Sequence, residues 1–404
     1  MEGYRGRWAA LAAALLLALG GVGSALAQSA HGHDHKAMGG AGKMARAGLA
    51  ASAAFDDRGR LWAVSVAGEY VEVRSSTDFG ATWSSPVKVN PVAEPVEADG
   101  DSRPRIAVGT GGEIYVTWTK PLAKPFTGEI RFSRSVDGGK TFSTPRPVHA
   151  DRQVITHRFD SMTITRDGRV LVAWVDKRDL VAAGGKAAAY AGAAIYYAVS
   201  DDRGASFRGD FKAADNSCEC CRIALVPQPD GNVLALWRHV FPGSVRDHAL
   251  ATLGVDGKVT GMRRATWDGW TIDACPHHGP SLAVDGRGRL HAVWFSDAKQ
   301  KSGVFYGRLE ADRVVGERRV GGATAEHADL AVSGQRVAIA WKEFDGRNSQ
   351  LRALVSNDGG ATFSERELAA TADASDQPRL LSYDGKFYVF WNTRREPLRV
   401  VSLP

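Results

Sequence analysis

The sequence predicts an all-β protein, a β-propeller of four-stranded blades, and three observations support this prediction. A turn glycine followed by an apolar strand that ends in tryptophan recurs along the chain, with turn positions spaced by 47 to 63 residues. The runs between turns are short and rich in Val, Ile, Tyr and Trp, as β-strands are. No segment shows convincing helical periodicity. Repeats at this interval are typical of propeller blades.

Seven units of this repeat can be followed in chain order. Five keep both marker residues: Gly112 to Trp118, Gly168 to Trp174, Gly231 to Trp237, Gly288 to Trp294 and Gly385 to Trp391. Gln335 to Trp341 has lost the glycine, and Gly59 to Ser65 has lost the tryptophan. The last unit, from Gln377 to Leu403, has room for three strands, and residues just after the N-terminal tail could supply its fourth. We therefore predict seven blades, with six as the alternative.

Four units carry a second motif, Ser-x-Asp-x-Gly followed by an aromatic residue, between their third and fourth strands. Its aspartates are Asp78, Asp137, Asp202 and Asp358. The Ser and Asp side chains can bond to the turn's own backbone, and glycine supplies a positive φ. The motif resembles the Asp box, or BNR repeat, of sialidases and their relatives. This resemblance implies a sialidase-like propeller fold; the box itself is a structural turn and implies no activity.

The N-terminus predicts export. Arg5 and Arg7 precede the apolar run Trp8 to Leu19, and Ala25 to Ala27 offers a small-x-small cleavage site. We expect residues 1–27 to be a signal peptide, 28–47 a flexible His/Met-containing tail and 48–404 a single propeller domain. The protein is then secreted across the inner membrane to the periplasm or the cell exterior, with no membrane span in the mature chain.

The charge balance argues against nucleic acid as a partner. The chain has 51 basic and 45 acidic residues and a net charge of +6. Charges of both signs are interspersed, so no basic stripe is available to follow a phosphate backbone.

Cysteine and histidine residues gather at equivalent positions of three successive units. His157, Cys220 and His277 each lie 11 residues before the turn glycine of their unit, and four others lie 10 or 13 before it. The innermost strands of a propeller start near its axis, so these side chains are expected to line one funnel, with His239 and His327 on the same face. The predicted metal ligands are Cys218, Cys220, Cys221, Cys275, His277 and His278, with His157 as the next candidate.

Thiolate and imidazole groups suit Cu(I), Cu(II) or Zn(II) and do not suit Ca or Mg. The tail adds copper-compatible donors at His31, His33, His35, Met38 and Met44. We therefore expect copper, with Cu(I) favoured and zinc as second choice. The Cys-x-Cys-Cys and Cys-Pro-His-His elements look like those of exported metal-handling propellers, a looser resemblance that implies a metal ion as ligand and an exported or outer-membrane metal-transport partner.

Two alternatives compete with metal handling. An even number of cysteines outside the cytoplasm favours disulfides, for example between Cys218 and Cys275, on a non-catalytic interaction propeller. A bridge between the adjacent Cys220 and Cys221 would be strained.

The sialidase resemblance implies a glycoside hydrolase as the other alternative, with an arginine triad that binds a carboxylate. Arg105, Arg222 and Arg379 stand near the starts of three innermost strands. No motif marks a catalytic acid or nucleophile among Asp160, Asp176, Glu343 and Tyr383. We therefore predict a binding protein rather than an enzyme; if it is an enzyme, a sialidase-like glycoside hydrolase is expected.

Overall fold

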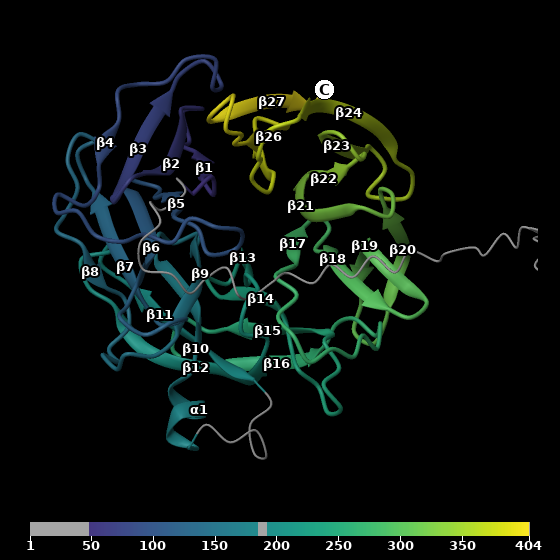
Figure 1. The fold of residues 1–404 in the computed structure, drawn as a ribbon, viewed down its shortest axis with the longest axis horizontal. Helices are drawn as coiled ribbons and strands as arrows, with labels where there is room; N and C mark the ends of the chain where they lie inside the picture. The colour runs from purple at the N-terminus through teal and green to yellow at the C-terminus, as the bar shows by residue number, and fades with distance from the viewer. Residues whose placement is uncertain (1–47, 185–191, 404) are drawn as a thin grey trace, which may run out of the picture. The chain divides into compact units, whose positions relative to one another are not determined.

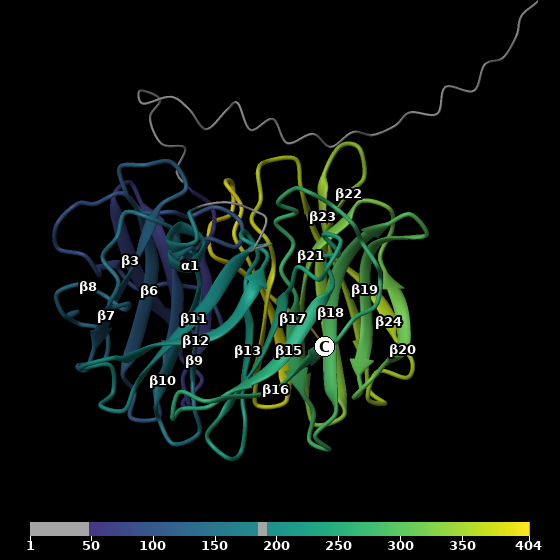
Figure 2. The same ribbon diagram turned by 90° about the horizontal axis from the view of Figure 1, so that it is seen from below.

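The computed structural model describes residues 48–184 and 192–403, which form seven antiparallel sheets around one axis (Figure 1). The predicted seven-bladed propeller is confirmed. The strands run between the two faces of the ring (Figure 2). The predicted signal peptide and His/Met tail lie outside the described residues. Among the described residues, no helix is long and apolar enough to cross a membrane.

Each of the first six blades has four strands in chain order, from the axis outward. Blade 1 is β1 (Ser52–Phe55), β2 (Leu61–Ala67), β3 (Tyr70–Ser76) and β4 (Val87–Lys88); blade 2 is β5 (Arg105–Val108), β6 (Ile114–Pro121), β7 (Gly128–Ser135) and β8 (Arg146–Pro147). Blade 3 is β9 (His157–Ile164), β10 (Val170–Asp176), β11 (Ala193–Ser200) and β12 (Arg208–Ser217), with the short helix α1 (Arg178–Ala182) after β10.

The remaining blades follow the same order. Blade 4 is β13 (Ala224–Pro227), β14 (Val233–Arg238), β15 (His248–Leu253) and β16 (Val259–Arg264); blade 5 is β17 (Ser281–Val284), β18 (Leu290–Ala298), β19 (Lys301–Leu309) and β20 (Val314–Val320). Blade 6 is β21 (Ala325–Ser333), β22 (Arg336–Phe344), β23 (Ser349–Ser356) and β24 (Ser364–Thr371); blade 7 is β25 (Arg379–Tyr383), β26 (Lys386–Trp391) and β27 (Arg399–Leu403).

Blade 7 has three strands in the described part of the chain, so the fourth strand expected from the residues after the tail is not formed by residues 48–51. These residues contact the inner end of blade 7 instead: the Asn392 side-chain amide donates to the Leu49 carbonyl at 2.7 Å. The reason is positional. Residue 52 already begins the innermost strand of blade 1, so the chain just before it lies near the axis and not beside the outer strand β27.

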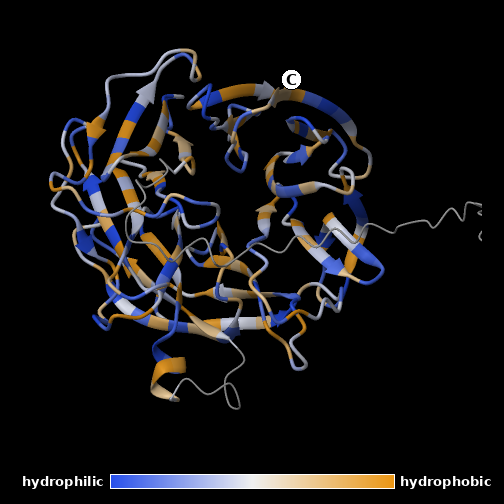
Figure 3. Ribbon diagram, viewed as in Figure 1, coloured by the Kyte–Doolittle hydropathy of each residue, from blue (hydrophilic) through white to orange (hydrophobic). Residues whose placement is uncertain are grey.

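The repeat tryptophans in the second strands of blades 2 to 7 are blade core, as the repeat predicts. Trp118, Trp174, Trp237, Trp294, Trp341 and Trp391 are all buried. Five of their indole N–H groups find acceptors, as in the 2.8 Å bond from Trp174 Nε1 to Asp176, and Trp237 Nε1 is the exception. The outer strand β24 is mostly hydrophilic (Figure 3). The apolar surface therefore lies between blades, where adjacent sheets pack face to face.

The four Ser-x-Asp-x-Gly motifs fold as equivalent turns. The serine hydroxyl accepts the glycine N–H at 2.8 to 2.9 Å in all four. The aspartate accepts from the residue four positions later, as Asp78 does from Thr82 at 2.9 Å. Hydrogen bonds from the Thr82 and Ser76 side chains hold the pKa of Asp78 at about 2. The Asp78 carboxylate therefore stays ionised to a lower pH than a free aspartate does.

Arg103 closes the ring. Its two terminal nitrogens donate to the two carboxylate oxygens of Asp376, each at 2.9 Å, and one of them also donates to the Ala51 carbonyl at 2.9 Å. These three residues precede blades 2, 7 and 1, so one guanidinium links the last blade to the first two. The Arg103 and Asp376 side chains are 0% and 3% exposed.

The same segment reaches across the axis. Asp101 Oδ2 accepts the backbone N–H groups of Arg222 at 3.2 Å and Gly279 at 3.0 Å, which precede blades 4 and 5. Arg105 donates to the Asp160 carbonyl of blade 3 at 3.1 Å. Residues 101–105 therefore hold the inner strand starts of most blades from a single position.

Replacing the ring-closing arginine should cost far more stability than replacing an exposed one. Arg103→Gln leaves Asp376 buried without its charge partner, and breaking such a pair costs about 3–5 kcal/mol. We expect that loss in the unfolding free energy measured by urea denaturation. Arg395→Gln is the matched control on blade 7, because Arg395 is 81% exposed in its ion pair with Asp373, and an exposed pair contributes about 0–1 kcal/mol. Equal losses in the two variants would contradict the closure role.

Candidate functional site

The innermost strands surround a cavity of about 240 Å³ on the axis. Its wall includes the first residues of several of these strands, among them Ser52, Arg105, Ser281 and Arg379, with Arg222 beside them. Burial, followed by the charges of Arg379 and Arg103, lowers the pKa of Arg105 to about 9. The wall also includes Asp329, which lies 3.4 Å from Arg379, so three arginines and one carboxylate line the cavity.

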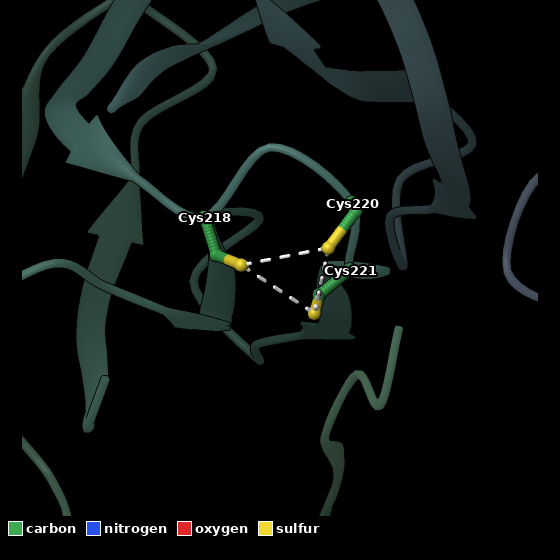
Figure 4. Close-up of side chains that lie close together, drawn as sticks. All are labelled: Cys218, Cys220 and Cys221. Carbon is green, nitrogen blue, oxygen red and sulfur yellow. Dashed lines mark hydrogen bonds between the residues drawn. The ribbon is translucent and has the colours of Figure 1, made fainter. Parts of the chain in front are cut away.

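Three cysteines form a compact cluster in the segment between β12 and β13. Their sulfur atoms point toward one another (Figure 4), at 3.7 Å between Cys218 and Cys220, 3.8 Å between Cys218 and Cys221 and 4.0 Å between Cys220 and Cys221. All three are 2–3% exposed and pack against Phe159 and Ala193 of blade 3. The thiols thus lie in the wall between blades 3 and 4, beside the axis and not open to it.

These separations fit donors around one ion. A disulfide requires about 2.05 Å between sulfurs, and all four cysteines are free thiols in this structure. Metal–sulfur bonds of about 2.3 Å place tetrahedral sulfurs about 3.8 Å apart and trigonal sulfurs about 4.0 Å apart. The three thiols therefore stand close to a ready-made three-sulfur ligand set.

The electrostatics favour one thiolate first. Hydrogen bonds from Cys220 and Cys221, then the charges of Arg238 and Arg246, lower the pKa of Cys218. Burial raises the pKa of Cys220 and of Cys221. A soft cation would meet one anionic sulfur, and its binding would release protons from the other two.

Cys275 and His277 border this cluster. Cys275 is half-buried and packs against the three thiols, and its hydrogen bond with Cys220 lowers its pKa. The ring of His277 lies 6.3 Å from that of Phe159, which also packs on the cysteines. His277 itself is exposed to solvent. Cys275 therefore lies at the edge of the thiol cluster, and His277 follows it two residues later in an exposed position.

Asp101 brings the two cysteine-containing motifs together. The two N–H groups that it accepts, from Arg222 and Gly279, directly follow Cys221 and His278. Both lie nine residues before their turn glycines at 231 and 288. The two motifs, whose equal offsets predict a common site, are thus held together by the Asp101 carboxylate. No motif marks Asp101, so it was not predicted from the sequence.

The His278 side chain packs against blades 5 and 6, apart from the thiols. Its ring stacks on Phe295 at 4.1 Å and on His327 at 4.5 Å, and burial lowers its pKa to about 3. The side chains of His278, Glu326 and His327 form a separate group of metal-type donors within 4.8 Å of one another. The structure therefore divides the predicted ligand set into a thiol group and an imidazole group.

His157 is placed in neither group. Its ring stacks on His149 at 3.9 Å, its Nδ1 is 3.1 Å from the Gly128 carbonyl, and its Nε2 is 3.7 Å from Asp176. Phe159, two residues on, faces the thiols instead, because a register shift in the β9–β10 pairing and its φ of 55° break the strand's alternation. A metal role for His157 stays a prediction.

Comparison with known proteins supports the fold. No protein-family profile and no curated protein sequence matches the chain. An ulvan lyase of polysaccharide lyase family PL25 shares 11% identity over 88% of this chain and 92% of its own, with a TM-score of 0.55. A protein of unknown function from Dyadobacter fermentans has 16% identity over 75% and 92%, with a TM-score of 0.49. The NanB sialidase of Streptococcus pneumoniae has 10% identity over 74% and 65%, with a TM-score of 0.45. The structural likeness to the ulvan lyase supports the propeller fold alone.

The buried histidine beside His157 should make stability pH-dependent. Burial, then the charge of His157, lowers the pKa of His149 to about 3. His149 takes up a proton near pH 6.5 in the unfolded chain but stays neutral in the folded chain at that pH. Its contribution to the unfolding free energy is therefore fully present above pH 6.5 and is lost as the pH falls. The loss is about 1.4 kcal/mol per pH unit for each such imidazole. The unfolding free energy, measured by urea denaturation, should fall less steeply between pH 7 and 5 in His149→Asn than in the natural chain. An identical pH dependence in the two proteins would contradict this prediction.

Proposed function

We propose that this protein is an exported copper-handling propeller that binds Cu(I) through Cys218, Cys220 and Cys221. The observation that supports it best is the triangle of buried sulfurs with edges of 3.7 to 4.0 Å. Cys275 and His277, at the border of the triangle, complete the ligand set. The metal is cargo that is bound, taken up or delivered.

The donors favour a soft cation. Thiolates select Cu(I) and zinc over Ca and Mg, and a three-sulfur set suits trigonal Cu(I). Three thiolates around Cu(I) carry a net charge of −2, which is costly to bury without positive charge nearby. Arg238 and Arg246 supply that charge, since both lower the pKa of Cys218. Zinc is the second choice, with Cys275 as the fourth sulfur of a tetrahedral site.

Delivery would involve the segments at the chain's start. The tail residues His31, His33 and His35 offer imidazoles that can capture copper after export to the periplasm or cell exterior. An exported or outer-membrane transport protein is the partner that such cargo requires.

A sugar-processing enzyme is the second candidate, and the three arginines in the wall of the axial cavity favour it. Arg105, Arg222 and Arg379 all line that cavity, as an anionic sugar would need. The solved propellers that resemble this chain include a sialidase and an ulvan lyase. Arg222, however, already donates through Nε, Nη1 and Nη2 to Pro280, Asp101 and Ala328 of its own chain. Because the Arg222 guanidinium already uses its donors within the chain, it is not available to bind a substrate carboxylate. We therefore place copper binding first.

The decisive measurement is a Cu(I) titration of the untagged mature chain against a competing chelator, without oxygen. Each of Cys218→Ser, Cys220→Ser and Cys221→Ser should weaken binding by more than about a hundredfold, since even outer-shell partners of a metal contribute about 10- to 100-fold. Ser217→Ala is the matched control, because Ser217 is buried directly before Cys218 at the end of β12 and has no thiol. It should bind Cu(I) as the natural chain does. Weak binding in every variant, with no titratable thiols, would establish structural disulfides instead.

The enzyme candidate is tested separately with a fluorogenic sialoside and with ulvan. The copper proposal predicts no turnover above that of an Arg379→Ala variant. Turnover that this variant abolishes, while the Cys218→Ser chain retains it, would favour the sugar-processing function.

A further inference from the structure

A second group of metal-type side chains lies apart from the thiols. His278 ends the Cys-Pro-His-His motif before blade 5, and Glu326 and His327 lie in the first residues of β21 in blade 6. Their donor atoms are within 4.8 Å of one another. None of the three belongs to the proposed Cu(I) site.

Each imidazole has one nitrogen without a hydrogen-bond partner among the described residues. Nδ1 of His278 and Nδ1 of His327 are buried and have no hydrogen-bond partner among the described residues. The two rings stack at 4.5 Å, and Phe295 covers His278 at 4.1 Å. Leaving a buried polar atom unpaired costs about 1–3 kcal/mol. Two such atoms side by side point to a ligand that uses their lone pairs.

The backbone of β21 is distorted where it contributes to this group. Successive side chains of a regular strand point to opposite faces of the sheet. Here the pairing with β22 shifts register between Glu326 and Asp329, and His327 has a φ of 53°. Such bulges turn side chains and gather at functional sites. The distortion lets Glu326 and its neighbour His327 both face His278.

Glu326 carries the charge of the group. Its carboxylate lies 3.5 Å from His327 Nε2 and 3.1 Å from Lys342 Nζ, and its side chain is 38% exposed. The site is therefore open to solvent at the carboxylate and closed at the imidazoles. Lys342 neutralises Glu326 and would compete with a cation for it.

We propose that His278, Glu326 and His327 bind a divalent transition metal, Zn²⁺ or Cu²⁺. Two imidazoles and one carboxylate form the donor set of zinc sites that keep an open fourth position. Metal–nitrogen bonds of about 2.0–2.1 Å require donors about 3.3 Å apart, so side-chain rotation draws the group together around the ion. This inference goes beyond the proposed Cu(I) function and does not depend on it, because the two sites share no residue.

Co²⁺ is the probe, since its spectrum separates sulfur ligation from nitrogen and oxygen ligation. The background is the mature chain with Cys218, Cys220, Cys221 and Cys275 changed to Ser and with His31, His33 and His35 changed to Ala. We expect one Co²⁺ per chain, with visible bands and no sulfur charge-transfer band. Glu326→Gln should weaken binding at least about tenfold and His327→Ala at least about a hundredfold. Lys342→Gln should strengthen it, because the competing ammonium is gone.

His239→Ala is the matched control, a buried histidine of blade 4 whose ring packs on Phe241. It should bind Co²⁺ as the background does. Failure of the background to bind Co²⁺, or equal affinity in His327→Ala and His239→Ala, would overturn the proposal. Near-ultraviolet circular dichroism checks folding, and the conservative Glu326→Gln keeps the test open if His327→Ala unfolds. Cu(I) titration of Glu326→Gln with its cysteines intact should match the natural chain, so this site and the thiol site fail or succeed separately.

Discussion

The buried ion pair between Arg103 and Asp376 is the interaction on which the architecture depends. A propeller must join its last blade to its first, and here no strand from the N-terminal side of the described chain completes blade 7. The closure combines apolar packing between blades 1 and 7, which buries Ala63, Phe390 and Leu398, with one guanidinium that links Asp376, Ala51 and its own blade. Because both charges of the ion pair are buried, each depends on the other, and this polar contact at the inner edge acts together with the apolar packing in place of a shared outer strand.

The same segment determines where chemistry can occur. Asp101, two residues before Arg103, accepts the N–H groups that directly follow the two Cys/His motifs. The motifs come from blades 4 and 5, and this carboxylate holds their ends at one height on the axis. Closure of the ring and assembly of the thiol site are therefore parts of one network. A substitution at Asp101 is expected to disturb both, whereas one at Cys220 affects the site alone.

The sequence predicted the structural features that recur from blade to blade, but it did not predict features that occur only once. Turn glycines and core tryptophans recur in most units, so the seven blades followed from them. Equal offsets placed Cys220 and His277 near each other, since equivalent positions of neighbouring blades meet near the axis. His157 shares that offset, yet its side chain turns into its own blade because the bulge at Phe159 interrupts the alternation. Glu326 could not be foreseen, because the register shift that turns it toward His278 has no sequence motif.

Burial restricts how a metal ion can reach the thiol site. Cys218, Cys220 and Cys221 are enclosed by packed blades, and a charged ion cannot reach them directly through apolar walls. Cys275 is the one cysteine of the four that is only partly buried, and it packs against the other three. An ion bound first by Cys275 could pass inward by exchanging one sulfur for the next, without ever lacking a soft ligand. Under the copper proposal, Cys275 is then the exchange ligand that controls the rate of loading and release, while the triangle behind it sets the affinity.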